Sequence, residues 1–184
     1  QMGNKPFATD AVKLAVIKKF IVSTKNIRFE GDGYSNLGIF SQSELTSRYY
    51  IMNERYAKDL LVEANTMHTM LVQQILPGAF EYRGSLAQTI QALNGIEDEA
   101  QSPELVALLA LTPAVKDLQA AIASLNEAIA KLHAIHDDPV AEAKAASDYI
   151  LPAMQAARTA ADRLEILTAD KYYPIPRYSE LLWF

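Results

Sequence analysis

The longest run of regularly spaced apolar residues lies between Phe40 and Ile75. It opens with Ser41 and Glu44 in the S-x-x-E spacing of a capping box, flanked by Phe40 and Leu45 as a hydrophobic staple. An apolar side chain then follows every three or four residues, as on one face of a helix. These positions are Tyr49, Met52, Tyr56, Leu60, Ala64, Met67, Leu71 and Ile75. The pattern predicts a single rod of about 50 Å, at roughly 1.5 Å per residue, whose stripe needs partners to cover it.

The rod is predicted to bend and continue at Pro77-Gly78. Proline removes one helix hydrogen bond and crowds the carbonyl four residues before it, so the bend is expected between Gln73 and Leu76. Asn94-Gly95 then supplies the kind of stop that helices use at their carboxyl ends. The inward positions expected after the bend are Phe80, Leu86, Ile90 and Leu93.

Two helix starts are predicted close together in the second half of the chain. Ser102-Pro103-Glu104 is typical of the start of a helix, here a short one through Leu111. Thr112-Pro113 repeats the cap-then-proline signal and predicts the start of another helix. That helix carries a heptad seam, which predicts antiparallel packing at a shallow crossing angle. The seam consists of Val115, Leu118, Ile122, Leu125, Ile129 and Leu132.

A last helix is predicted from Asp138-Pro139 to about Leu167, with Pro152 as a second internal kink. Both kinked helices contain the step Ile-Leu-Pro, at residues 75–77 and 150–152. The fold class predicted is all-α, a bundle of long, proline-kinked antiparallel helices with an aromatic C-terminal tail. The inward positions of the last helix are Val140, Ile150, Met154, Ala157, Ala161 and Leu164.

Residues 1–38 are predicted to form an N-terminal helix and a Gly-rich connecting loop, and residues 39–184 the bundle with its docked tail. Thr9 or Asp10 can cap the first helix, which should end near Asn26. Gly31-Asp32-Gly33 is favoured as a plain turn, although it also resembles a fragment of a phosphate or metal loop.

The tail is rich in aromatic residues that would be sticky if they were solvated. We therefore expect it to dock, either on its own bundle or on another subunit. Its candidate interface residues are Tyr172, Tyr173, Tyr178, Leu181, Trp183 and Phe184.

Composition limits the classes of function. A chain of 184 residues is large enough for one domain with its own core. A net charge of −5 argues against a nucleic-acid partner, because no basic stripe is present. The chain has no cysteine, which excludes disulfides and thiolate sites and favours the cytoplasm. No apolar run approaches the roughly 20 residues of a membrane span, so no membrane partner is expected.

Residues able to carry chemistry are few. His133 and His136 lie one turn apart beside Asp137, a spacing that can hold a metal, but a plain histidine pair at a helix end is favoured because further ligands are missing. A di-iron carboxylate site needs Glu-x-x-His on two helices, and no histidine here follows a glutamate by three. Phosphate-loop and G-x-S-x-G motifs are also absent. The sequence therefore predicts no catalytic, cofactor-binding or metal-binding residue.

Three groups of segments together resemble the C-terminal region of type III glutamine synthetase, a glutamate-ammonia ligase. The first is residues 25–35 (KNIRFEGDGYS). The second is residues 44–49 (ELTSRY), continuing through 62–65 (VEAN) to 74–77 (QILP). The third is residues 151–154 (LPAM), 160–165 (AADRLE) and 173–182 (YPIPRYSELL). In order and approximate spacing these segments cover most of the chain.

This resemblance implies a helical assembly domain without catalytic residues. In the family, the ATP site, the Mg²⁺ or Mn²⁺ ligands and the glutamate-binding arginines lie mostly upstream. The resemblance thus implies an inactive chain whose partners are the catalytic domain of the same enzyme and neighbouring subunits in a homo-oligomer. The alternative is a stand-alone helical-bundle interaction module, which the heptad seam fits equally well. A weaker third possibility is a sensor of a small regulator, for which no dedicated pocket residues are evident.

Overall fold

The computed structural model describes residues 41–94 and 102–176, where it forms helices and no strands. The predicted all-α class is confirmed. The chain divides into two compact units, Gln1–Arg55 and Tyr56–Phe184. The predicted first helix and the Gly-Asp-Gly turn lie outside the described residues, and the predicted domain boundary after residue 38 stays a prediction.

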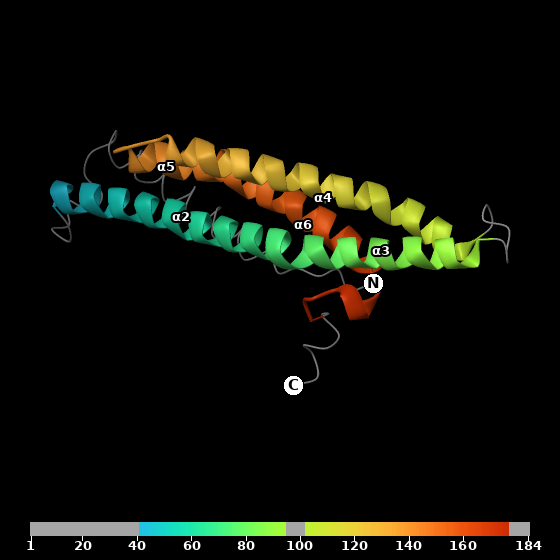
Figure 1. Cartoon of the computed structure of the whole chain (residues 1–184). Coiled ribbons are helices and arrows are strands. Elements are labelled where there is room, and N and C mark those ends of the chain that lie inside the picture. Colours follow the sequence, from blue (N-terminus) through green and yellow to red (C-terminus); the bar gives the residue numbers. More distant parts are fainter. Residues whose placement is uncertain (1–40, 95–101, 177–184) are drawn as a thin grey trace, which may run out of the picture. The chain divides into compact units, whose positions relative to one another are not determined.

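The elements in order are α2 (Gln42–Met70), π turn η1 (Leu71–Ile75), α3 (Leu76–Leu93), α4 (Pro103–His133), α5 (Pro139–Ala145), π turn η3 (Ala146–Ile150), α6 (Leu151–Leu167) and the 3₁₀ turn η4 (Asp170–Tyr172) (Figure 1).

The capping box at the start of α2 is confirmed. The backbone N–H of Ser41 donates to Glu44 Oε2 at 2.7 Å, and the backbone N–H of Glu44 donates to Ser41 Oγ at 3.3 Å. The Ser41 hydroxyl donates to the same carboxylate oxygen at 2.8 Å. These hydrogen bonds stabilise the charged form, so the pKa of Glu44 lies below its ordinary value, with the backbone N–H of Ser41 as the largest cause.

The apolar stripe of α2 is confirmed in part. Leu60 and Ala64 are buried in the core, as predicted, together with Leu71 and Ile75 of η1. Met52, in contrast, is 55% exposed, so its predicted inward position is wrong. The buried side chain at this turn is Asn53, which satisfies its polar group by donating from Nδ2 to the carbonyl of Tyr49 at 2.7 Å. A polar residue can therefore take an inward position when the helix backbone supplies the acceptor.

Both Ile-Leu-Pro steps follow a π turn. The N–H of Leu76 bonds to the carbonyl of Leu71, and the N–H of Leu151 bonds to that of Ala146, each five residues back. The wider turn contains one extra residue, which relieves the crowding that proline imposes on the preceding carbonyls. The predicted continuation of the helix through Pro77 is confirmed, whereas the bends at Pro77 and Pro152 stay predictions.

Helix α4 runs through Pro113 without a break, so the predicted helix start at Thr112-Pro113 is wrong. Proline inside a helix costs about 3 kcal/mol. Here the ring lies on the exposed side, while its neighbours Leu111, Ala114 and Val115 are each at most 1% exposed. The proline leaves the carbonyl of Leu109 without its usual helix partner, and Leu109 is itself 64% exposed, where water can reach it. Burial of the flanking residues therefore outweighs the local cost of the proline.

The heptad seam of α4 forms the centre of the core. Val115, Leu118, Ile122, Leu125 and Leu132 are buried, and Ile129 is half-buried against the same cluster, as the pattern predicts. Helix α4 packs against α6 and α3, and in Figure 1 its direction along the chain is opposite to both. The ion pair between Arg163 Nη1 and Asp117 Oδ2, at 2.8 Å, joins α6 to α4 at the exposed edge of this contact.

The turn from α4 to α5 is set by two aspartates. Asp137 adopts a left-handed conformation with φ of 59°, which aspartate tolerates better than most residues. Asp138 then caps α5, as predicted, because its Oδ1 accepts the backbone N–H groups of Val140 and Ala141 at 3.1 and 3.0 Å. On the returning helical segment, η3 and α6, the predicted inward residues Ile150, Ala157, Ala161 and Leu164 are buried as expected.

One helix of the described part, α4, is long and apolar enough to cross a membrane by length and composition. The interior helix of a bundle passes the same test, and eight of its side chains lie in the core, from Leu111 to Leu132. The finding is weak support for a membrane segment, and the expectation of no membrane partner stays a prediction.

Truncating the seam should reveal its share of the stability. Leu118 is fully buried, so Leu118→Ala should lower the free energy of unfolding by about 2 to 5 kcal/mol, through lost burial and a new cavity. Leu109→Ala, on the same helix but 64% exposed, should change it by roughly 0.5 kcal/mol or less. Urea denaturation followed by circular dichroism measures both, and equal losses would contradict the assignment of the seam.

Candidate functional site

The first part of the tail docks on α3 of its own chain, at Gly78. A Cβ at this position would collide with the carbonyl oxygen of Tyr172 and would stand 3.3 Å from Cδ of Pro174. Only glycine allows the tail backbone to approach the helix this closely. The two residues of the Pro-Gly pair thus lie at two different features of α3. Pro77 stands just after the π turn, and Gly78 provides the space that the backbone of Tyr172 occupies.

Tyr172 fixes this contact through its ring and its hydroxyl group. Its ring centroid lies 5.3 Å from that of Tyr82, at an interplanar angle of 35°. Its hydroxyl donates to Ser85 Oγ at 3.1 Å. Gly78, Tyr82 and Ser85 are spaced by four and three residues, so they share one face of α3. Tyr173 and Ile175, which follow in the tail, pack against the hydrophobic core.

Two of the six predicted interface residues, Tyr172 and Tyr173, thus make contacts within their own chain. Tyr178, Leu181, Trp183 and Phe184 lie outside the described residues, and their role at an interface stays a prediction. Sequence reasoning missed Gly78 and Ser85. The available signal for Gly78 was a glycine directly after Pro77, inside a helical pattern, which is typical of the close approach of another backbone.

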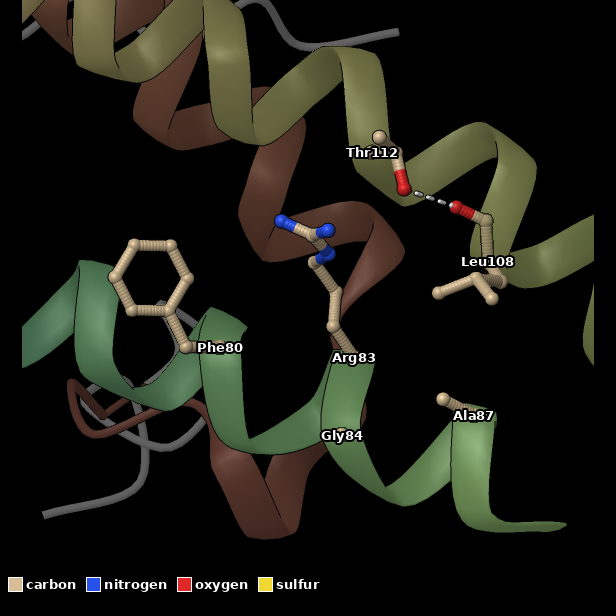
Figure 2. A pocket seen from close by; sticks show the side chains of 6 residues that line it. All are labelled: Phe80, Arg83, Gly84, Ala87, Leu108 and Thr112. Carbon is tan, nitrogen blue, oxygen red and sulfur yellow. Dashed lines mark hydrogen bonds between the residues drawn. The ribbon is translucent and has the colours of Figure 1, made fainter. Parts of the chain in front are cut away.

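A second feature of α3 is a groove of about 350 Å³ that it forms with α4. In Figure 2, the Arg83 side chain extends from α3 toward α4, between Phe80 and Leu108. Phe80 is 44% exposed, so its predicted inward position is wrong, whereas Leu86 and Ile90 are buried as expected. The groove is lined by Phe80, Arg83, Gly84 and Ala87 of α3 and by Leu108 and Thr112 of α4.

Arg83 differs from the other described arginines of this unit. Arg158 and Arg163 bond carboxylates, Asp162 at 2.7 Å and Asp117 at 2.8 Å. Arg83 has no such partner in the described part of the chain, and its Nε is buried with no acceptor. Sequence reasoning missed this residue. The available signal was a lone arginine among Phe80, Gly84 and Ala87, at the spacing of one helix face.

The histidines are separate from both features. His133 is the last residue of α4, His136 is exposed in the following turn, and His68 lies on α2. Within residues 41–94 and 102–176, no three His, Cys, Asp or Glu side chains gather closely enough to hold a metal. What this part of the chain offers is a backbone docking point and a cationic apolar groove.

Comparison with known proteins finds similarity in the part of the chain that holds both features. The family model described as "Glutamine synthetase C-terminal domain" matches residues 35–94, which include α2, η1 and α3. This third of the chain is therefore similar to the C-terminal domain of glutamine synthetases. The resemblance to type III glutamine synthetase seen in the sequence is thereby confirmed, and the docking point at Gly78 and Arg83 both fall within the matched residues.

Three curated relatives extend the similarity along the chain. The type-3 glutamine synthetase of Dictyostelium discoideum is 28% identical over 170 residues, 89% of this chain and 22% of the relative. The glutamine synthetase of Butyrivibrio fibrisolvens is 28% identical over 153 residues, 83% of this chain and 22% of the relative. That of Bacteroides fragilis (strain YCH46) is 24% identical over 215 residues, 95% of this chain and 29% of the relative. The chain therefore spans between a fifth and a third of the length of these relatives.

The two helical glycines of α3 should respond in opposite ways to a methyl group. Gly78→Ala forces the tail away from α3 and should lower the free energy of unfolding by about 1 to 3 kcal/mol. Gly84→Ala meets nothing within 4 Å and should raise it by up to about 1 kcal/mol, because alanine is the better helix former. Urea denaturation compares the two variants. A shift of the same sign in both would contradict the docking of Tyr172 at Gly78.

Proposed function

We propose that this region is a structural and assembly domain of a glutamine synthetase, which packs on the catalytic part of the enzyme and on neighbouring subunits. The observation that carries the proposal is the combination of family and length. The chain matches the C-terminal domain family and spans only 22% of two glutamine synthetases. The remaining length of such an enzyme has room for the machinery of the reaction, for which the described residues offer no candidate.

Exposed apolar side chains support a packing role. In the unit from Tyr56 onward, several large apolar side chains remain exposed although the bundle has its own core, among them Val62 at 65%, Val106 at 64% and Ile166 at 83%. Apolar residues that stay exposed on a folded domain commonly mark the surfaces through which it contacts other proteins or domains. A domain of this kind meets other parts of its protein through such surfaces, and the matches favour this role over a stand-alone interaction module.

The parent reaction that we propose is the ATP-dependent ligation of ammonia to glutamate in the cytoplasm. Mg²⁺ or Mn²⁺ and ATP would bind to the catalytic part of the enzyme, where a metal ion can neutralise charge on the transferred phosphoryl group. This chain would supply no ligand to them. Its contribution to the reaction would be indirect, through the assembly that it stabilises.

The isolated chain should therefore be inactive. Incubated with ATP, Mg²⁺, glutamate and ammonia, it should release ADP no faster than a control protein of similar size, and it should bind ATP no more tightly. A coupled ADP assay measures the first and equilibrium dialysis the second. Turnover that a point substitution in this chain abolishes would overturn the assignment, because a contaminating enzyme would not respond to that substitution.

The distal part of the tail should control assembly. A chain that ends at Pro176 keeps the contacts of Tyr172 and Tyr173 but lacks Tyr178, Leu181, Trp183 and Phe184. We expect the full chain to self-associate and the shortened chain to show a lower mass by light scattering, with unchanged ellipticity at 222 nm. Tyr172→Phe, which removes only the hydrogen bond to Ser85, serves as the control and should keep the mass of the full chain. An equal mass for the full and shortened chains would contradict an interface in the distal tail.

A further inference from the structure

The groove between α3 and α4 has the size and chemistry of a small ligand site. Its volume of about 350 Å³ lies at the lower end of the range for small-molecule pockets. Apolar groups of Phe80, Ala87 and Leu108 surround a single charged group, the guanidinium of Arg83 (Figure 2). Predominantly apolar walls with one well-placed polar group are typical of sites that orient an amphipathic ligand.

Among the described residues, no group accepts a hydrogen bond from Arg83 Nε in this groove. This Nε is buried, and the hydroxyl of Thr112, which also lines the groove, already donates to the carbonyl of Leu108 at 2.8 Å. A guanidinium carries five N–H donors and no acceptor, so only an oxygen-bearing or anionic group can satisfy it. The chain as a whole has a net charge of −5, which disfavours an anion at any site without a local positive charge. An anion in this groove would therefore depend on Arg83.

We propose that this groove binds a small carboxylate carried on a flat apolar group. The carboxylate would accept paired hydrogen bonds from the Arg83 guanidinium, a geometry that suits the planar fork of arginine. The apolar group would lie beside Phe80 and Leu108, over the open surface at Gly84, where no heavy atom stands within 4 Å of an added Cβ. A helix about 10 Å across is too wide for this volume, so a single-ring molecule fits better than a helical partner. This inference does not rest on the assembly role proposed above.

The test uses 3-phenylpropionate and its neutral analogue 3-phenylpropionamide, titrated into the ¹⁵N-labelled full chain. We expect the acid to cause saturable NMR shifts centred on residues 80–87 and 108–112, and the amide to bind at least tenfold more weakly. Equal affinity for the acid and the amide would overturn the proposal, because the groove would then be an apolar crevice that does not use the charge. Shifts centred on other residues would also overturn it.

Two substitutions test the groove itself. Arg83→Gln should weaken binding of the acid at least tenfold, whereas the matched control Arg158→Gln, which removes an exposed charge paired with Asp162, should leave it unchanged. Gly84→Leu should also abolish binding by filling the open space, and its ellipticity checks that the helix persists. Binding that survives Arg83→Gln would refute the site.

A last measurement separates a free ligand from a protein segment. A capped pentapeptide with adjacent Phe and Glu presents the same chemistry on a polypeptide backbone. We expect the free acid to bind at least as tightly as this peptide. Saturable binding of the peptide without binding of the acid would identify the groove as a protein-docking site and would overturn the small-molecule assignment.

Discussion

The structure depends on the burial of one seam, the apolar face of α4 against α6 and α3. Leu111, Leu118 and Leu125 are fully buried along it, and each such side chain contributes roughly 1.5 to 3 kcal/mol relative to an exposed one. This term is large enough to keep α4 helical through Pro113 and to bring α6 back along the same helix. Alanines at positions 114, 157 and 161 fill the spaces between the larger residues and permit the close approach of the helices. Surface ion pairs such as Arg163 with Asp117 contribute much less, since both partners are 55% exposed.

The sequence predicts the helices well because their periodicity and their capping residues are local signals. Ser41 with Glu44 and Asp138 with Pro139 mark helix starts that the structure confirms. The failures have a common cause, which is that tertiary burial overrides a local signal. Thr112-Pro113 has the local form of a helix start, but the core on both sides of it carries the helix through. Asn53 is buried and the neighbouring Met52 is exposed, because the amide of Asn53 forms a hydrogen bond within the helix that allows its burial.

The candidate sites were harder to predict than the fold. The docking of Tyr172 on Gly78 joins residues 94 positions apart, and no periodicity connects them. The groove with Arg83 requires the relative rotation of α3 and α4, which a sequence pattern leaves undefined. The resemblance to glutamine synthetases, in contrast, could be recognised from the sequence alone because it depends on the order of short motifs. Family and fold class were therefore accessible, whereas the positions of partnering side chains were not.

The π turn before Pro77 also sets the phase of α3. From Met67 the positions that face the core or its edge advance by four residues each time, through Leu71, Ile75 and Ala79 to Arg83. In a regular α-helix each step of four overshoots a full turn by about 40°, so four steps would rotate the stripe by about 160°. The extra residue of η1 removes about 100° of this drift, the angle of one residue. The backbone irregularity thus works as a phase correction, which keeps Leu86 and Ile90 inward and leaves Arg83 at the boundary between the core and the groove.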